Sequence, residues 1–118
     1  MSNTIITNDA YITPRQASEI LGVSYRKAIA LIVSGIGIDF HNEKGRYRVC
    51  LASVRDALAS NAQAIEEIKA DTVKRYKQGL SVEFLMRNAA EKFKERNIFG
   101  HDPANVAEKA IYDYLMEA

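Results

Sequence analysis

The chain has 118 residues, 47% of them hydrophobic, so its length allows one small domain or a small domain with an assembly arm. Sixteen basic and fifteen acidic residues leave a net charge of +1. The chain is therefore not strongly basic, and its composition alone does not identify it as a nucleic-acid-binding protein. No apolar run approaches the roughly 20 residues of a membrane-spanning helix, and a single cysteine, Cys50, excludes an intramolecular disulfide.

Residues 1–12 form a polar leader ahead of the first predicted helix. The start of this leader, Met1 to Thr4, lacks the basic residues and the apolar core of a signal peptide. The lone cysteine agrees with a reducing compartment. We therefore expect a cytoplasmic protein.

Two short helical patterns meet at Gly22. The first has clear start signals, with Thr13 as N-cap, Pro14 at the first helical position and Gln16 placed to reach back to the cap. Gly22 ends this helix, because glycine readily adopts the left-handed conformation that turns a chain out of a helix. Ser24 caps the second helix. Two helices joined by about three residues are typical of a helix-turn-helix.

The second helix is the predicted DNA-reading element. Its inward stripe consists of Ala28, Leu31 and Ile32. Its start carries polar and basic residues, namely Ser24, Tyr25, Arg26 and Lys27. The first turn of a recognition helix meets base edges and phosphates in a major groove, so we predict these four residues as DNA contacts. Arg15, on the first helix, is predicted to hold the DNA backbone next to them.

A small β-hairpin is predicted after this helix pair. The pattern is strand, polar turn and strand, over residues 38–40, 41–45 and 46–49. Alternation places Arg46 and Arg48 on one face of the second strand and Tyr47 and Val49 on the other. Beside a recognition helix such a hairpin is a wing, and we predict Lys44, Arg46 and Arg48 at phosphates or in the minor groove.

The order of these motifs resembles the winged helix-turn-helix of the MerR and phage excisionase superfamily. The residues that carry the resemblance are Thr13-Pro14-Arg15-Gln16-Ala17, Leu21-Gly22-Val23-Ser24, Ser34-Gly35, Gly45-Arg46-Tyr47-Arg48-Val49 and Ala52-Ser53-Val54. The resemblance covers residues 13–58 and implies binding to double-stranded DNA. The chain departs from relatives at Ala30 and Val33, where they often carry polar residues, so base readout is expected to depend on the first turn of the helix.

A long helix is predicted next, because residues 52–77 contain neither glycine nor proline and would span about 39 Å. Residues along it step alternately by three and four, namely Leu51, Val54, Leu58, Asn61, Ile65, Ile68 and Thr72. This spacing fits either a coiled-coil seam between chains, with Asn61 fixing the register, or a helix packed within its own chain. The resemblance favours the first, because MerR-like proteins pair through a helix placed here. It implies oligomerisation through Leu58, Asn61, Ile65 and Ile68.

Two further helices are predicted at the end of the chain. Ser81 caps one over residues 82–97, with an apolar side made of Phe84, Leu85, Ala89 and Phe93. Asp102 caps the other, which starts at Pro103. The expected fold is mainly α, with a leader over 1–12, a winged helix-turn-helix with a small hairpin wing over 13–58, and a helical oligomerisation arm over 59–118.

No enzyme is expected, because the chain lacks a glycine-rich phosphate loop, a nucleophile signature and a defensible carboxylate pair. Its two histidines and one cysteine lack metal-ligand spacing, so neither a metal nor a cofactor is expected.

The sequence therefore predicts a sequence-specific double-stranded DNA-binding protein, a transcriptional regulator or excisionase-like factor of bacterial or phage type. We expect it to form a homodimer or a higher homo-oligomer and not to associate with a membrane. Two alternatives stay open. One is a phage terminase small subunit that recognises DNA for packaging, and the other is a protein-interaction adaptor that retains the winged fold without binding DNA.

Overall fold

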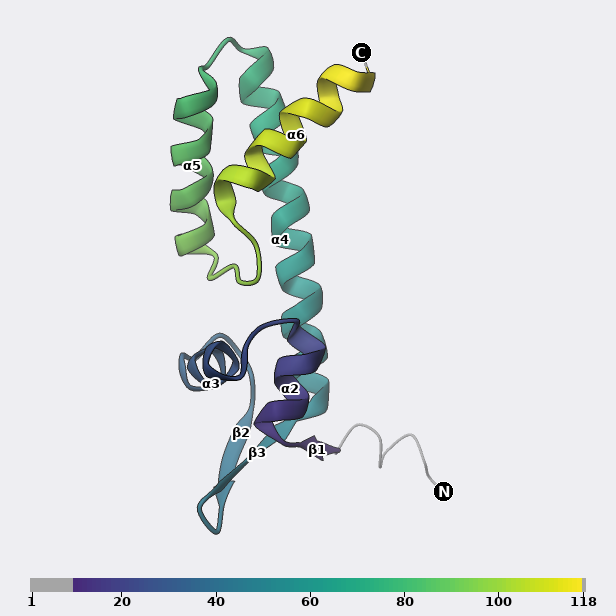
Figure 1. Ribbon diagram of the computed structural model, residues 1–118, viewed down its shortest axis with the longest axis vertical. Coiled ribbons are helices and arrows are strands. Elements are labelled where there is room, and N and C mark those ends of the chain that lie inside the picture. Colours follow the sequence, from purple (N-terminus) through teal and green to yellow (C-terminus); the bar gives the residue numbers. More distant parts are fainter. Residues whose placement is uncertain (1–9, 118) are drawn as a thin grey trace. The chain divides into compact units, whose positions relative to one another are not determined.

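The computed structural model describes residues 10–117, and the chain divides into two compact units, Met1–Ser60 and Asn61–Ala118. The described part is mainly helical, with five helices and one small antiparallel sheet (Figure 1). None of the helices between residues 10 and 117 is long and apolar enough to cross a membrane. Residues 1–9 of the predicted leader lie outside the described part.

The first unit combines a helix pair with a three-stranded sheet. Its elements are β1 (Tyr11–Ile12), α2 (Pro14–Leu21), α3 (Tyr25–Val33), β2 (Phe40–Glu43), β3 (Arg46–Cys50) and the beginning of α4 (Leu51–Lys77). The strand order is β1-β3-β2, and both pairings are antiparallel. The last two residues of the predicted leader thus form an edge strand on β3.

The local signals at the two helix starts are confirmed. Thr13 Oγ1 accepts a hydrogen bond from the Gln16 backbone N–H at 3.1 Å, and Gln16 Oε1 accepts one from the Thr13 N–H at 2.9 Å. Gly22 ends α2 with a left-handed φ of 71°. Ser24 Oγ then accepts from the Lys27 N–H at 3.1 Å and caps α3. The turn between α2 and α3 is therefore held at both ends by short-range hydrogen bonds.

The hairpin differs from the prediction, because its turn contains two residues rather than five. Lys44 and Gly45 both have positive φ values, of 53° and 81°, which is the backbone of a two-residue turn that matches strand twist. Residues 41–43, predicted as turn, instead pair with residues 46–48 across the hairpin. Ile38, predicted to start the first strand, is a buried core residue ahead of β2.

The core of the first unit lies between the helices and the inner face of the sheet. Its buried apolar residues are Ala17, Leu21, Ala28, Leu31, Ile32, Ile38, Val49 and Val54. This confirms the inward stripe predicted for α3. Ser53 is also buried, and its hydroxyl accepts from the Asp39 N–H at 2.9 Å and donates to the Cys50 carbonyl at 2.8 Å. Leu58, one of the residues predicted to take part in oligomerisation, keeps 36% of its surface exposed.

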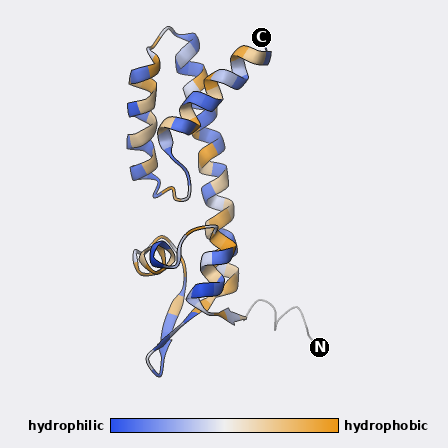
Figure 2. Ribbon diagram, viewed as in Figure 1, coloured by the Kyte–Doolittle hydropathy of each residue, from blue (hydrophilic) through white to orange (hydrophobic). Residues whose placement is uncertain are grey.

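The second unit is built from three helices. Residues 61–77 of α4 are followed by α5 (Val82–Glu95) and α6 (Pro103–Glu117), and hydrophobic and hydrophilic stretches alternate along all three (Figure 2). Ser81 caps α5, and Asp102 Oδ2 accepts from the Asn105 N–H at 3.1 Å at the start of α6. Helix α5 ends two residues earlier than predicted, because Asn97 adopts a left-handed φ of 54°.

The apolar face predicted for α5 is correct in three of its four members. Leu85, Ala89 and Phe93 are buried, whereas Phe84 is 41% exposed. Phe84 immediately precedes Leu85, and consecutive residues of a helix point in directions about 100° apart, so with Leu85 at the centre of the buried face Phe84 lies at its edge.

The predicted interchain seam is corrected by the packing of the second unit. Ile65 and Ile68 belong to a core shared by the three helices, with Ala89, Phe93, Val106 and Ala107. Asn61 is buried and uses its amide on the loop before α6: Nδ2 donates to the Phe99 carbonyl at 3.0 Å, and Oδ1 accepts from the Phe99 N–H at 3.0 Å. These three side chains are therefore occupied inside their own chain.

Candidate nucleic-acid interface

The tight turn between α2 and α3 determines which side of α3 faces outward. Ala28, Leu31 and Ile32 fill the core. The opposite side of α3 carries Arg26, Ala30 and Val33, which share one face because they are spaced at i, i+4 and i+7. All three stripe residues are exposed, Val33 over 51% of its surface. We call Arg26, Ala30 and Val33 the outer stripe of α3. It begins with one cation and continues with two apolar side chains.

Basic residues gather at the start of this stripe. Arg26 and Lys27 lie exposed in the first turn of α3, and the Ser24 hydroxyl is used to cap that turn. The Arg15 guanidinium carbon lies 4.9 Å from the ring centroid of Tyr25, a distance at which a cation is attracted to an aromatic face. The structure therefore brings together the residues predicted as contacts on α2 and α3.

The two faces of the hairpin differ in chemistry. Val49 is fully buried, so the face of β3 that carries Tyr47 and Val49 is the inner one. Phe40 continues this face on β2, and its ring meets that of Tyr47 edge-on with centroids 5.4 Å apart. Arg46 and Arg48 lie on the other face, because alternate residues of a strand point to opposite sides.

The structure separates the two predicted arginine contacts of the hairpin. Arg48 Nε lies 3.6 Å from Glu43 Oε1, so its charge is partly neutralised within the hairpin. Arg46 is exposed next to the turn, and no ion pair among the described residues involves it.

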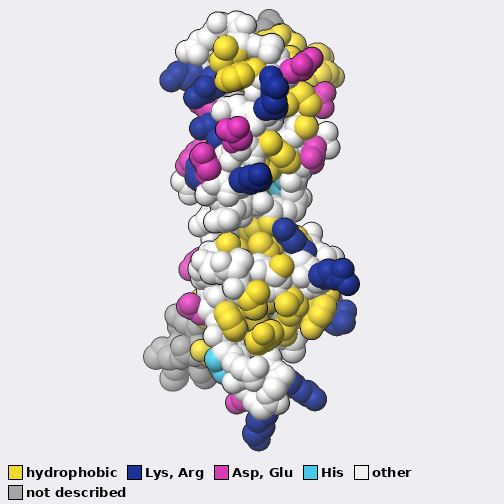
Figure 3. All heavy atoms as spheres, turned by 90° about the vertical axis from the view of Figure 1, so that its left-hand side faces the viewer, with side chains coloured by type: hydrophobic (Ala, Val, Ile, Leu, Met, Phe, Trp, Pro, Cys, Tyr) yellow, Lys and Arg dark blue, Asp and Glu magenta, His cyan; other side chains and the backbone are white. Residues whose placement is uncertain are grey.

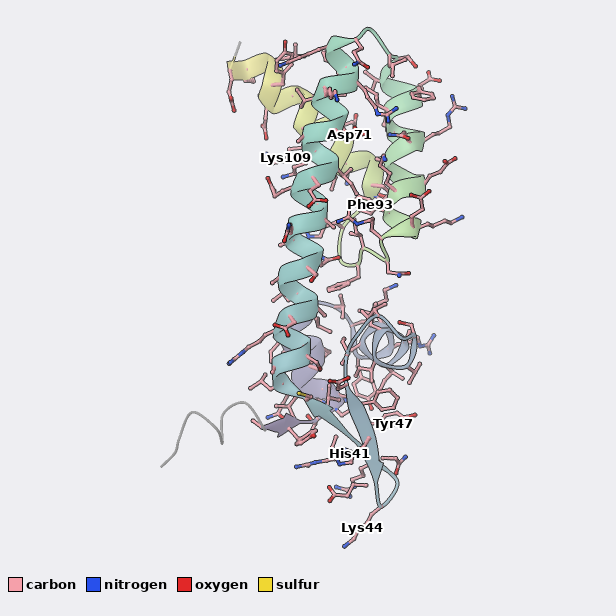
Figure 4. The ribbon with its side chains drawn as sticks, turned by 180° about the vertical axis from the view of Figure 1, so that it is seen from behind. His41, Lys44, Tyr47, Asp71, Phe93 and Lys109 are labelled. Atoms are coloured by element: carbon pink, nitrogen blue, oxygen red, sulfur yellow. The ribbon has the colours of Figure 1, made fainter. Side chains whose placement is uncertain are left out.

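The end of the hairpin carries an open hollow with three cations. It is lined by Glu43, Lys44, Arg46 and Arg48. Lys44 projects at the tip, and His41 and Tyr47 lie on the two sides of the hairpin (Figure 4). Lys44 and Arg46 are therefore the better placed of the predicted wing residues to meet an external anion.

A broad apolar area is visible on the side of the first unit where α3 lies. Figure 3 shows hydrophobic side chains in the middle of this face, with lysine and arginine side chains beside them and below them. The exposed large apolar residues of this unit include Tyr25, Val33 and Phe40. An exposed apolar area of this kind marks an interaction surface, and the cations beside it favour an anionic partner.

Comparison of the chain with protein families, with curated proteins and with solved structures found no match. Among residues 10–117, no group of three or more His, Cys, Asp or Glu side chains is placed to hold a metal ion.

The sequence reasoning missed the outer stripe beyond Arg26. Ala30 and Val33 were recognised only as departures from the polar pattern of relatives. Their position on one face with Arg26 follows from the helical period, since residues at i, i+4 and i+7 lie on the same side of a helix.

Proposed function

We propose that residues 13–58 form a winged helix-turn-helix that binds double-stranded DNA in a sequence-specific manner. In this proposal α3 enters the major groove and the β2–β3 hairpin is the wing. The observation that carries the proposal is the outer stripe of α3, an exposed helix face that starts at Arg26 and is bordered by Lys27 and Arg15.

The residues have different roles in this proposal. Arg26 donates hydrogen bonds to a base edge, most favourably to guanine O6 and N7. Arg15 and Lys27 neutralise phosphates beside the groove, while Lys44 and Arg46 do so from the end of the wing. Tyr25 lies at the groove edge with Arg15 against its ring. No cofactor takes part.

We further propose that the protein works as a homo-oligomer. One winged unit offers few base contacts, and single modules typically bury only about 600 to 1,000 Å² on DNA. Joining two units makes the second binding event intramolecular and raises avidity by on the order of a hundredfold. The resemblance to MerR and excisionase proteins supports a regulator or an excisionase-like factor.

Because the seam of α4 is occupied, we assign the contact between copies to α6. Its exposed apolar residues are Tyr112, Leu115 and Met116, at 61%, 52% and 69% of their surface. Val82 and Ile111 extend this area along an open hollow that Glu108 and Lys109 also line. Glu108 and Lys109 place opposite charges beside this area, and Lys109 Nζ also lies 3.5 Å from Asp113 Oδ2 of its own chain.

Selection from random duplexes at physiological salt tests the DNA-binding proposal. Enrichment of a consensus is the expected result, and repeated half-sites in it would also reveal the symmetry of the assembly. Ring-shaped or other higher-order assembly in solution favours the terminase small subunit over a dimeric regulator. Failure to bind any duplex at low salt would contradict DNA binding and select the adaptor alternative.

A further inference from the structure

The outer stripe of α3 contains more than the arginine that reads a base edge. Ala30 and Val33 are exposed one and two turns beyond Arg26, yet neither side chain has a hydrogen-bond donor or acceptor. If α3 enters the major groove, as proposed above, these two side chains face the base edges. They can recognise only an apolar group there.

The major groove of B-DNA displays one apolar group, the C5 methyl of thymine. We propose that Ala30 and Val33 contact thymine methyl groups and make this protein selective for sites with thymine at two positions. DNA is favoured as the occupant of this face by the cations around it, with Arg26 and Lys27 at its start and Lys44 and Arg46 at the end of the hairpin.

Helix geometry determines the spacing of the expected thymines. Four residues of an α-helix rise about 6 Å, and successive base pairs are about 3.4 Å apart, so with the axis of α3 along the stack of base pairs Ala30 lies about two base pairs beyond Arg26. Val33 lies about one further base pair along. The selected site should therefore contain a guanine followed, after about two and about three base pairs, by thymines on either strand.

Deoxyuridine lacks only the C5 methyl, so it tests this contact without changing base pairing. We would take the duplex recovered by selection and replace its thymines with deoxyuridine one at a time. Affinity of the intact protein should fall about fourfold at each contacted position, the effect of losing one buried methyl group. Replacement at flanking thymines should leave the affinity unchanged.

A protein variant assigns the contact to α3. Val33→Thr keeps the side-chain shape at an exposed position but replaces a methyl with a hydroxyl, and it should reduce the discrimination between thymine and deoxyuridine at one position only. Val73→Thr is the matched control, because Val73 is partly exposed on α4 and lies outside both the winged unit and the proposed contact between copies. This control should keep the full discrimination.

The outcomes separate the inference from the function on which it rests. A recovered consensus without thymines, or equal affinity for the thymine and deoxyuridine duplexes, overturns methyl recognition and leaves DNA binding intact. Discrimination that survives in Val33→Thr at every position overturns the assignment to Val33. Failure to bind any duplex at low salt overturns both proposals and leaves this face to a protein partner.

Discussion

Asn61 shows what a single buried polar side chain contributes to this fold. Its amide makes two hydrogen bonds with the backbone of Phe99, 38 residues away, and thereby fastens the loop before α6 to α4. Phe99 is itself 4% exposed, so water does not easily replace the amide. The polar position in the heptad pattern thus belongs to the core of its own chain.

Replacing Asn61 with leucine should destabilise the second unit by about 1 to 3 kcal/mol, because the buried Phe99 N–H and carbonyl lose their partner. Amide hydrogen exchange would show reduced protection in residues 61–117 and unchanged protection in residues 10–60. Gln63→Leu, at an exposed position of the same helix, is the control and should have little effect. A change in subunit number with unchanged protection would show that Asn61 acts between chains after all.

Arginines at three positions of the proposed DNA surface, Arg26, Arg46 and Arg48, should differ in their contribution to binding. Arg26→Ala should cost about 1 to 3 kcal/mol on the preferred site and blur its consensus, because a base contact discriminates. Arg46→Ala should weaken binding to all sequences and reduce the salt slope by about 0.9, as the loss of one phosphate contact does. Arg48→Ala should have a smaller effect, because Arg48 lies beside Glu43. Salt titrations of duplex affinity measure all three, and equal slopes for the Arg46 and Arg48 variants would contradict this placement of the wing.

At the scale of elements, the turn between α2 and α3 orients the proposed recognition helix. Gly22 has a φ of 71°, and a Cβ built there would meet no atom within 4 Å. A side chain at this position is therefore disfavoured by backbone conformation and not by a clash.

Gly22→Ala should lower the free energy of unfolding of the first unit by about 1 kcal/mol, because alanine resists the left-handed conformation. Gly22→Asn should cost less, since asparagine tolerates this conformation better. Urea unfolding of the two variants and the parent protein gives the comparison. If alanine and asparagine are equally costly, the left-handed backbone is not the cause.

For the whole molecule, the division into two units separates the proposed DNA surface from the proposed contact between copies. Residues 10–60 carry the outer stripe and the β2–β3 hairpin, and α6 carries the exposed apolar face. Variants can therefore remove assembly without touching a DNA contact. Variants in the buried part of α4 cannot be used for this purpose, because they disrupt the core of the second unit.

Tyr112→Lys combined with Leu115→Lys should convert the oligomer into a monomer while keeping its helical circular dichroism, because both positions are exposed in the folded chain. Ile65→Asp combined with Ile68→Asp should instead lose helicity, since it buries two unpaired carboxylates. Sedimentation velocity at micromolar concentration distinguishes monomer from oligomer. A parent protein that is already monomeric would refute assembly through α6, and a lysine variant that assembles like the parent would move the contact elsewhere.

Local chemistry made several features predictable from the sequence alone. The Thr13 and Gln16 capping box, the Gly22 stop and the Ser24 cap depend on residues within three or four positions of one another, so their hydrogen bonds follow from the order of residues. The inward stripe of α3 followed from the helical period for the same reason. The hairpin ends were less predictable, because its two-residue turn is selected together with the strand pairing.

Tertiary structure alone decided where the apolar faces go. The spacing of Asn61, Ile65 and Ile68 suits a partner helix from a second chain as well as helices of the same chain, because either supplies apolar surface at the same period. Only the folding of α5 and α6 against α4 shows that the chain fills this stripe itself. The same holds for α3: the sequence determined which residues share its outer stripe, but the packing of Ala28, Leu31 and Ile32 decided that this stripe stays exposed.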